Sequence, residues 1–136
     1  MEDANWLRDK IADNWSLTDI SPVIDVVYRY KDIDVRRKDW VLLYERGGGV
    51  RDFGLGGKYI LRENGVSIDI RTSDVDKYYK IKKEVERILI SLTNSKDTVN
   101  GVWNVICVLK VRETDLSDRS KGLYRCVIDV SVRSWR

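Results

Sequence analysis

The sequence of 136 residues contains no histidine, the side chain that most often acts as a general acid or base near neutral pH. It has only two cysteines, Cys107 and Cys126, and each stands among Val, Ile and Leu in a strand-like stretch. Two thiols without histidine cannot complete the usual cysteine and histidine sets that bind zinc. We therefore expect reduced, buried thiols, no metal site and no cofactor.

Long apolar runs are missing as well. No stretch of about 18 apolar residues is present to cross a membrane, and the N-terminus lacks the basic and then apolar pattern of a secretion signal. The net charge is only +3 and the charges are interspersed, so composition by itself does not indicate nucleic-acid binding. We expect a single α+β domain over residues 1–136, assembled in the cytoplasm and without a membrane partner.

The clearest element that is present is a long amphipathic helix, predicted from Ser73 to Leu92. Ser73 or Asp74 can cap its first free amides, and its charged residues, Glu84 among them, are predicted on the solvent-exposed faces. Its apolar residues recur at helical spacing and form one stripe, which consists of Tyr78, Ile81, Val85, Ile88, Leu89 and Leu92. This stripe predicts a helix that covers one face of a sheet.

The other elements predict that sheet. A shorter helix is expected from Ala4 to Trp15, and a polar turn region from Asn94 to Asn100. Strands are expected from Val23 to Tyr30, Trp40 to Glu45, Tyr59 to Arg62, Val66 to Arg71, Val102 to Glu113 and Leu123 to Trp135. The order α-β-β-(β)-β-α-β-β predicts an α+β fold, in which a mainly antiparallel sheet is packed by the long helix and the short N-terminal helix.

Glycine is concentrated in one segment. Residues 46–58 hold six of the nine glycines, so we expect a long mobile loop or an extended hairpin arm there. Asn64-Gly65 follows between two strand-like runs and predicts the type I′ turn of a separate hairpin. Gly56-Gly57-Lys58 does not complete a nucleotide-binding loop, because Asp52 stands where the first glycine is needed and a strand follows.

The last two predicted strands each have one wholly apolar face. Alternate residues are apolar from Trp103 to Val111 and from Tyr124 to Val132, and we expect both faces to pack on the long helix. The opposite face mixes aliphatic and charged residues, and no helix remains to cover it, so we expect another subunit there. The candidates for this oligomer interface are Val102, Ile106, Val108, Leu123, Arg125 and Val127.

Two functions that involve nucleic acid stay open as alternatives. A Mg²⁺-dependent nuclease of the restriction-endonuclease-like fold needs an Asp and a Glu-x-Lys motif on neighbouring strands to bind metal and activate water. Asp69-Ile70-Arg71 offers an acid and a base at that spacing without Glu or Lys, and Asp52 or Glu45 would have to be the second ligand. A nucleic-acid-binding module would use the basic residues of the long helix, which Glu84 and Glu86 interrupt.

The order of elements and three stretches of sequence resemble the tail terminator, or tail completion, proteins of long-tailed phages and related head-tailed viruses. A strand with alternating acid, Val66 to Thr72, leads directly into the long helix, which includes Glu84-Val-Glu-Arg-Ile-Leu89. The stretch from Asp118 to Val132 is similar to the closing strand of that family. The expected fold is therefore tail-terminator-like.

This resemblance implies a non-enzymatic virion protein without catalytic residues. It would form a homo-oligomeric ring, typically a hexamer, that ends the tail tube and joins it to the head connector or a neck protein, with DNA passing through the ring. The glycine-rich segment departs from compact members of the family, so a related neck or baseplate protein is an alternative. The loops expected to meet partners are 46–58 and 114–121, with Arg46, Arg51, Phe53, Lys58, Asp118 and Arg119 as candidates.

Overall fold

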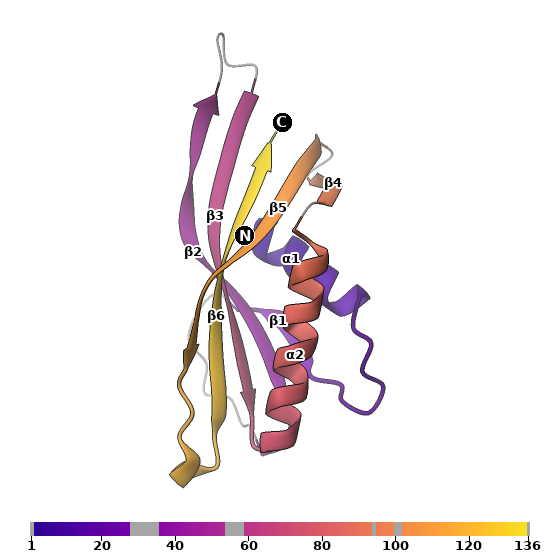
Figure 1. The fold of residues 1–136 in the computed structure, drawn as a ribbon, viewed down its shortest axis with the longest axis vertical. Coiled ribbons are helices and arrows are strands. Elements are labelled where there is room, and N and C mark those ends of the chain that lie inside the picture. The colour runs from indigo at the N-terminus through magenta and orange to yellow at the C-terminus, as the bar shows by residue number, and fades with distance from the viewer. Residues whose placement is uncertain (1, 28–35, 54–58, 94, 100–101, 136) are drawn as a thin grey trace.

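The computed structural model describes residues 2–27, 36–53, 59–93, 95–99 and 102–135 (Figure 1). For residues 48–53, 59–62, 95–99, 102–106 and 134–135 the description covers the backbone only. The elements are α1 (Glu2–Asp13), β1 (Val23–Val26), β2 (Trp40–Phe53), β3 (Tyr59–Thr72), α2 (Val75–Ser91), β4 (Ser95–Val99), β5 (Val102–Asp115), the short 3-10 helix η1 (Arg119–Lys121) and β6 (Tyr124–Trp135).

The strands form one six-stranded sheet in the order β1-β2-β3-β6-β5-β4. All neighbours are antiparallel except β1 and β2, which run parallel. The structure therefore confirms an α+β fold with a mainly antiparallel sheet. The strand predicted from Val23 to Tyr30 corresponds to β1, which ends at Val26. Residues 28–30 lie outside the described part of the chain.

Both helices lie on the same face of the sheet, which we call the helix face (Figure 1). The predicted stripe of α2 is confirmed, since all six of its residues are buried in the core. They meet alternate residues of the three central strands. The core also contains residues of the sheet, which are Val41, Leu43, Val66, Ile68, Ile70, Cys126, Ile128, Val130 and Val132, and residues of α1, which are Ala4, Leu7 and Ile11.

The start of α2 confirms Asp74 as its N-cap. The Asp74 carboxylate accepts hydrogen bonds from the amides of Asp76 at 2.8 Å and Lys77 at 3.2 Å. The prediction that Glu84 lies on a solvent-exposed face is wrong, because this residue is only 5% exposed. Its carboxylate accepts hydrogen bonds from the Ser16 amide and hydroxyl at 3.0 and 2.8 Å, which fixes the segment after α1 to α2.

Within the described residues, the glycine-rich segment contributes residues 46–53 to β2, and their pairing with β3 agrees with the interpretation as a hairpin arm. β2 and β3 pair from Trp40 with Arg71 to Phe53 with Tyr59, and Asn64 and Gly65 lie inside β3. The predicted turn at Asn64-Gly65 is therefore wrong. Gly65 lies against the Arg46 side chain instead, and a Cβ there would lie 3.0 Å from a guanidinium nitrogen of Arg46, so that side chain would have to shift. We call residues 46–53 and 59–65 the hairpin arm.

Two smaller predictions also need correction. The first helix ends at Asp13, and Trp15 follows it with its indole nitrogen donating to the Ile20 carbonyl at 2.9 Å. The predicted polar turn at Asn94 to Asn100 contains β4 instead, a strand of five residues. A short edge strand tolerates polar residues because only one side of it pairs, which explains why the sequence pattern concealed it.

The apolar face expected in β5 points the wrong way. Register places Val108 opposite Val132, so Val108 is buried on the helix face, whereas Val111 is 64% exposed. A β-bulge between Lys110 and Arg112 shifts the alternation further along the strand. Both faces of β5 contain aliphatic residues, so alternation alone could not decide which face is buried. In β6 the predicted face is confirmed.

Candidate functional site: the open face of the sheet

The predicted oligomer-interface residues do not share one face. Val108 belongs to the core, whereas Arg125 and Val127 lie on the face away from the helices. Leu123 precedes β6 and pairs with Asp118. Val102 and Ile106 lie in β5, with side chains outside the described part of the chain. Val108 is therefore removed from the candidates, and the other five stay predictions.

The sheet face away from the helices is not an aliphatic surface. The described centre of this face carries five arginines and three carboxylates, so positive charges exceed negative charges by two. We call it the arginine–carboxylate face. No helix covers this face within the described residues (Figure 1). Its charged members are Arg46, Arg71, Arg112, Arg125, Arg133, Glu63, Asp69 and Asp129.

Asp69 is the most buried acid of this face, with 1% exposure. Its carboxylate accepts hydrogen bonds from Nε and Nη2 of Arg71 at 3.1 and 2.8 Å. The same two atoms of Arg125 donate to it at 3.1 and 3.0 Å. Two guanidinium groups therefore saturate one carboxylate, as a buried charge requires. The arginine side chains also cover the sheet around it.

Asp129 forms the second centre, one strand away. It accepts a hydrogen bond from the Ser67 hydroxyl at 2.7 Å and bonds from Arg112 Nε and Nη2 at 3.2 and 3.0 Å, and Arg46 lies 3.5 Å away. Burial raises the pKa of Asp129, but the Ser67 hydroxyl and the two arginines outweigh this effect and lower the pKa below its usual value. Arg112 is 70% exposed in its side chain, so this centre reaches the solvent.

A third centre lies toward the hairpin arm. Glu63 accepts hydrogen bonds from the Ser131 hydroxyl at 3.2 Å and from Arg133 Nη2 at 3.3 Å. The three centres therefore follow one another along the length of β3 and β6. Sequence analysis missed this arrangement, although the alternation of Glu63, Ser67, Asp69 and Arg71 in one strand is a usable signal.

The residues proposed for a nuclease site do not come together. Asp69 and Arg71 bond to each other on the open face, whereas Glu45 accepts a hydrogen bond from the Ala4 amide of α1 on the helix face. The Asp52 side chain lies outside the described residues. Within the described part of the chain, no cluster of three or more metal-binding side chains occurs.

The two loops predicted to meet partners lie at opposite ends of the sheet (Figure 1). Arg46 belongs to the arginine–carboxylate face, and Arg51 and Phe53 lie in β2 with side chains outside the described part. Lys58 lies outside the described residues. Asp118 and Arg119 begin the turn around η1, where the Ser120 hydroxyl donates to Asp118 at 2.6 Å and lowers its pKa.

An ion-pair cluster joins α2 to β5 on the helix face. Glu113 pairs with Lys82 and, at 2.8 Å, with Lys110. Burial raises the pKa of Glu113, but the two lysines more than offset this and lower it to about 2. Cys126 is buried beside Glu113, and burial together with that negative charge raises the pKa of the thiol to about 12. The thiol is therefore a packed core group with little thiolate at neutral pH.

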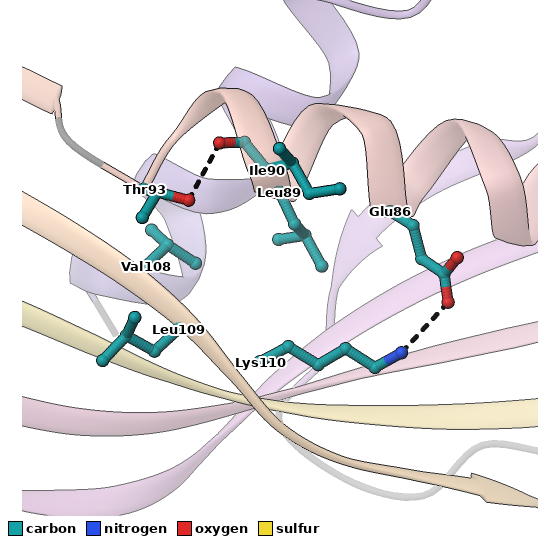
Figure 2. Close-up of a pocket in the computed structure, with 7 residues that line it drawn as sticks. All are labelled: Glu86, Leu89, Ile90, Thr93, Val108, Leu109 and Lys110. Carbon is teal, nitrogen blue, oxygen red and sulfur yellow. Dashed lines mark hydrogen bonds and ion pairs between the residues drawn. The ribbon is translucent and has the colours of Figure 1, made fainter.

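A groove runs between the end of α2 and β5 (Figure 2). It has a volume of about 240 Å³ and is lined mainly by the apolar side chains of Leu89, Ile90, Val108 and Leu109. An ion pair of 3.0 Å between Glu86 and Lys110 closes one end. We call this the α2–β5 groove. The sequence signal for it was Ile90, an isoleucine outside the buried stripe of α2.

No known protein-family model matches this sequence, and no curated protein matches it. Within the described residues, no helix is long and apolar enough to span a membrane. The interpretation of function therefore depends on the faces, edges and charges of the sheet.

Proposed function

We propose that this protein is a ring-forming virion subunit that ends the tail tube and joins it to the head connector, and that it acts by binding and not by catalysis. In this proposal the subunit belongs to the tail or neck of the virion, and six copies form the ring around a channel for DNA. Its partners are further copies of itself, the tail tube protein and a connector or neck protein.

One observation carries the proposal: the sheet is packed by helices on one face only and continues into a long hairpin arm. A subunit with one packed face and one open face offers surfaces for neighbouring chains without rearranging its core. The order of helix, strands, long helix and terminal strands matches what the resemblance to tail terminators implies. The charged groups of the open face bond to one another, which suits a rigid binding surface better than a reactive site.

The salt bridges of the arginine–carboxylate face also favour specific contacts with partner proteins. The excess of two positive charges and the exposed Arg112 favour partners with acidic surfaces, because complementary charge guides association and rejects wrong partners. The same surface supports the alternative of nucleic-acid binding, since arginines bind phosphate groups. The two interpretations differ in the expected partner: a virion subunit would attach to tail tubes, whereas a nucleic-acid-binding module would bind DNA without them.

Electron microscopy of the purified protein, alone and mixed with tail tubes, tests the proposal. We expect rings with a central channel, and a single ring at one end of each tube. Arg112→Glu is expected to weaken the attachment to tubes or connectors, whereas Lys80→Glu, which changes an exposed residue of α2, serves as the matched control. Isolated particles that bind DNA with a steep salt dependence and ignore the tubes would support the nucleic-acid alternative instead.

A further inference from the structure

The edge of the sheet beside β5 is only partly covered. β4 pairs with Val102–Ile106, whereas β5 continues to Asp115. Beyond β4 the amide of Val108 donates to the Leu92 carbonyl at 3.4 Å. From Leu109 to Glu113, no strand lies on this edge among the described residues. Backbone groups of an uncovered edge are ready to pair with another strand.

Apolar surface lies directly beside this edge. The α2–β5 groove has Val108 at its floor and Ile90, which is 75% exposed, at its rim (Figure 2). Further along the same edge, Val111 at the bulge of β5 is 64% exposed. A strand added to β5 would place one of its side chains over the groove, because alternate side chains of a strand point to the same face. Main-chain pairing with a side-chain pocket is a common way to bind an extended segment.

The opposite edge of the sheet has a matching open segment. β1 pairs with Trp40–Leu43 only, whereas β2 continues to Phe53. On the outer side of residues 47–53, the described part of the chain contains no strand. Three consecutive glycines, residues 47–49, leave the backbone of this segment without side chains that would hinder close approach.

We propose that residues 47–53 of one copy pair with residues 109–113 of the next copy, and that this contact closes the ring. Three antiparallel steps separate β2 from β5 in the sheet, so the two edges run in opposite directions and the new pair is antiparallel. Each copy offers one edge of each kind, which makes a head-to-tail contact of the sort that generates rings. This inference rests on the proposed ring function and names its subunit contact.

The placement of the two edges sets the geometry of the ring. The open part of β2 lies in the hairpin arm at one end of the sheet, and the open part of β5 leads toward the turn at the other end (Figure 1). Pairing them requires neighbouring copies to be staggered along the strands. A closed ring then has strands tilted against its axis, as in closed β-barrels.

Cross-linking between two variants that each have one accessible cysteine tests the contact. Both variants carry Cys107→Ser, and Cys126 stays buried; one adds Gly49→Cys in the arm and the other adds Val111→Cys in β5. The probe is a bis-maleimide that spans about 10 Å, roughly two strand spacings. We expect covalent dimers in the mixture of the two variants but not in either variant alone. A chain with both cysteines should give a ladder that ends at the number of copies in the ring.

Ile90→Lys tests the groove, with Tyr79→Lys as the control. Both residues are exposed on α2, at 75% and 53%, but only Ile90 lines the groove. We expect Ile90→Lys to raise the concentration at which the ring dissociates by about tenfold or more, and Tyr79→Lys to leave it unchanged. Equal melting temperatures of the two variants, measured at concentrations at which both are monomeric, would show that the fold is intact.

The outcomes separate this inference from the proposed function. Rings that dissociate at the same concentration in both lysine variants would overturn the edge contact and leave the ring proposal standing. Rings whose arm and β5 cysteines never cross-link would do the same. Dissociation caused by Arg125→Glu but not by Ile90→Lys would assign the contact to the arginine–carboxylate face instead. A protein that stays monomeric under all conditions would refute both.

Discussion

Asp69→Asn is the substitution whose effect follows most directly from the structure. The carboxylate of Asp69 is almost fully buried and is bonded by the guanidinium groups of Arg71 and Arg125. Breaking a buried ion pair by removing one partner costs about 3–5 kcal/mol. Asparagine keeps the shape and one acceptor, and Arg125 is partly hydrated, so we expect a loss near the lower limit, about 3 kcal/mol.

Urea denaturation measures this loss. With a denaturant slope of about 2 kcal/mol/M, a loss of about 3 kcal/mol lowers the midpoint by about 1.5 M without changing the slope. Asp13→Asn is the control, because it removes an exposed acid at the end of α1 and should change stability by less than about 0.5 kcal/mol. Both variants are measured at the same protein concentration, since ring formation would add to apparent stability. Equal midpoints for the two variants would refute the role assigned to Asp69.

Three further predictions concern α2 and the strands β5 and β6. Asp74→Ala removes the N-cap of α2 and should lower the free energy of unfolding by about 1 kcal/mol in the same urea titration. The ion pairs of Glu113 contribute stability above pH 4.5, its ordinary pKa, and this contribution is lost as the pH falls from there toward its folded pKa of about 2. In Glu113→Gln, the urea midpoint should therefore change less with pH in that window. In native protein, a thiol reagent should modify the half-buried Cys107 much faster than the buried Cys126, and equal rates would contradict the packing of β6.

The parts of the fold that sequence predicted best are those with one strong period. The apolar residues of α2 and of β6 each form a single face, so only one face of each element can be buried. β5 has aliphatic residues on both faces, and its orientation depends on the register with β6 and on the bulge at Val111. Neither the register nor the bulge is visible in a single sequence.

Two local signals were misinterpreted because their cause lies in tertiary contact. Asn64-Gly65 has the composition of a tight turn, but Gly65 makes room for Arg46 and the Asn64 amide donates to Asp3. Glu84 has the spacing of an exposed helix residue, yet the chain after α1 brings Ser16 to its carboxylate. Contacts between residues about 20 to 70 positions apart leave little trace in local pattern.

For the open face, the sequence could predict the position in the sheet but not the contacts between its side chains. In β6, sequence alternation placed Arg125, Asp129 and Arg133 on the face without a helix, but it gave neither the pairing of Arg125 with Asp69 of β3 nor that of Arg112 of β5 with Asp129. Ile90, outside the buried stripe of α2, indicates exposed apolar surface, but the position of the α2–β5 groove could not be predicted from the sequence, because it depends on where β4 ends and on the side of β5 that meets α2.

Mass in solution tests the central claim, ring formation, most directly. Sedimentation of the purified protein over a range of concentrations should give one closed species with six times the 15.9 kDa mass of the chain, and no open series of larger assemblies. Another closed ring number would keep the proposal and change only the symmetry. A mass of one chain at every concentration, both alone and with tail tubes, would contradict it.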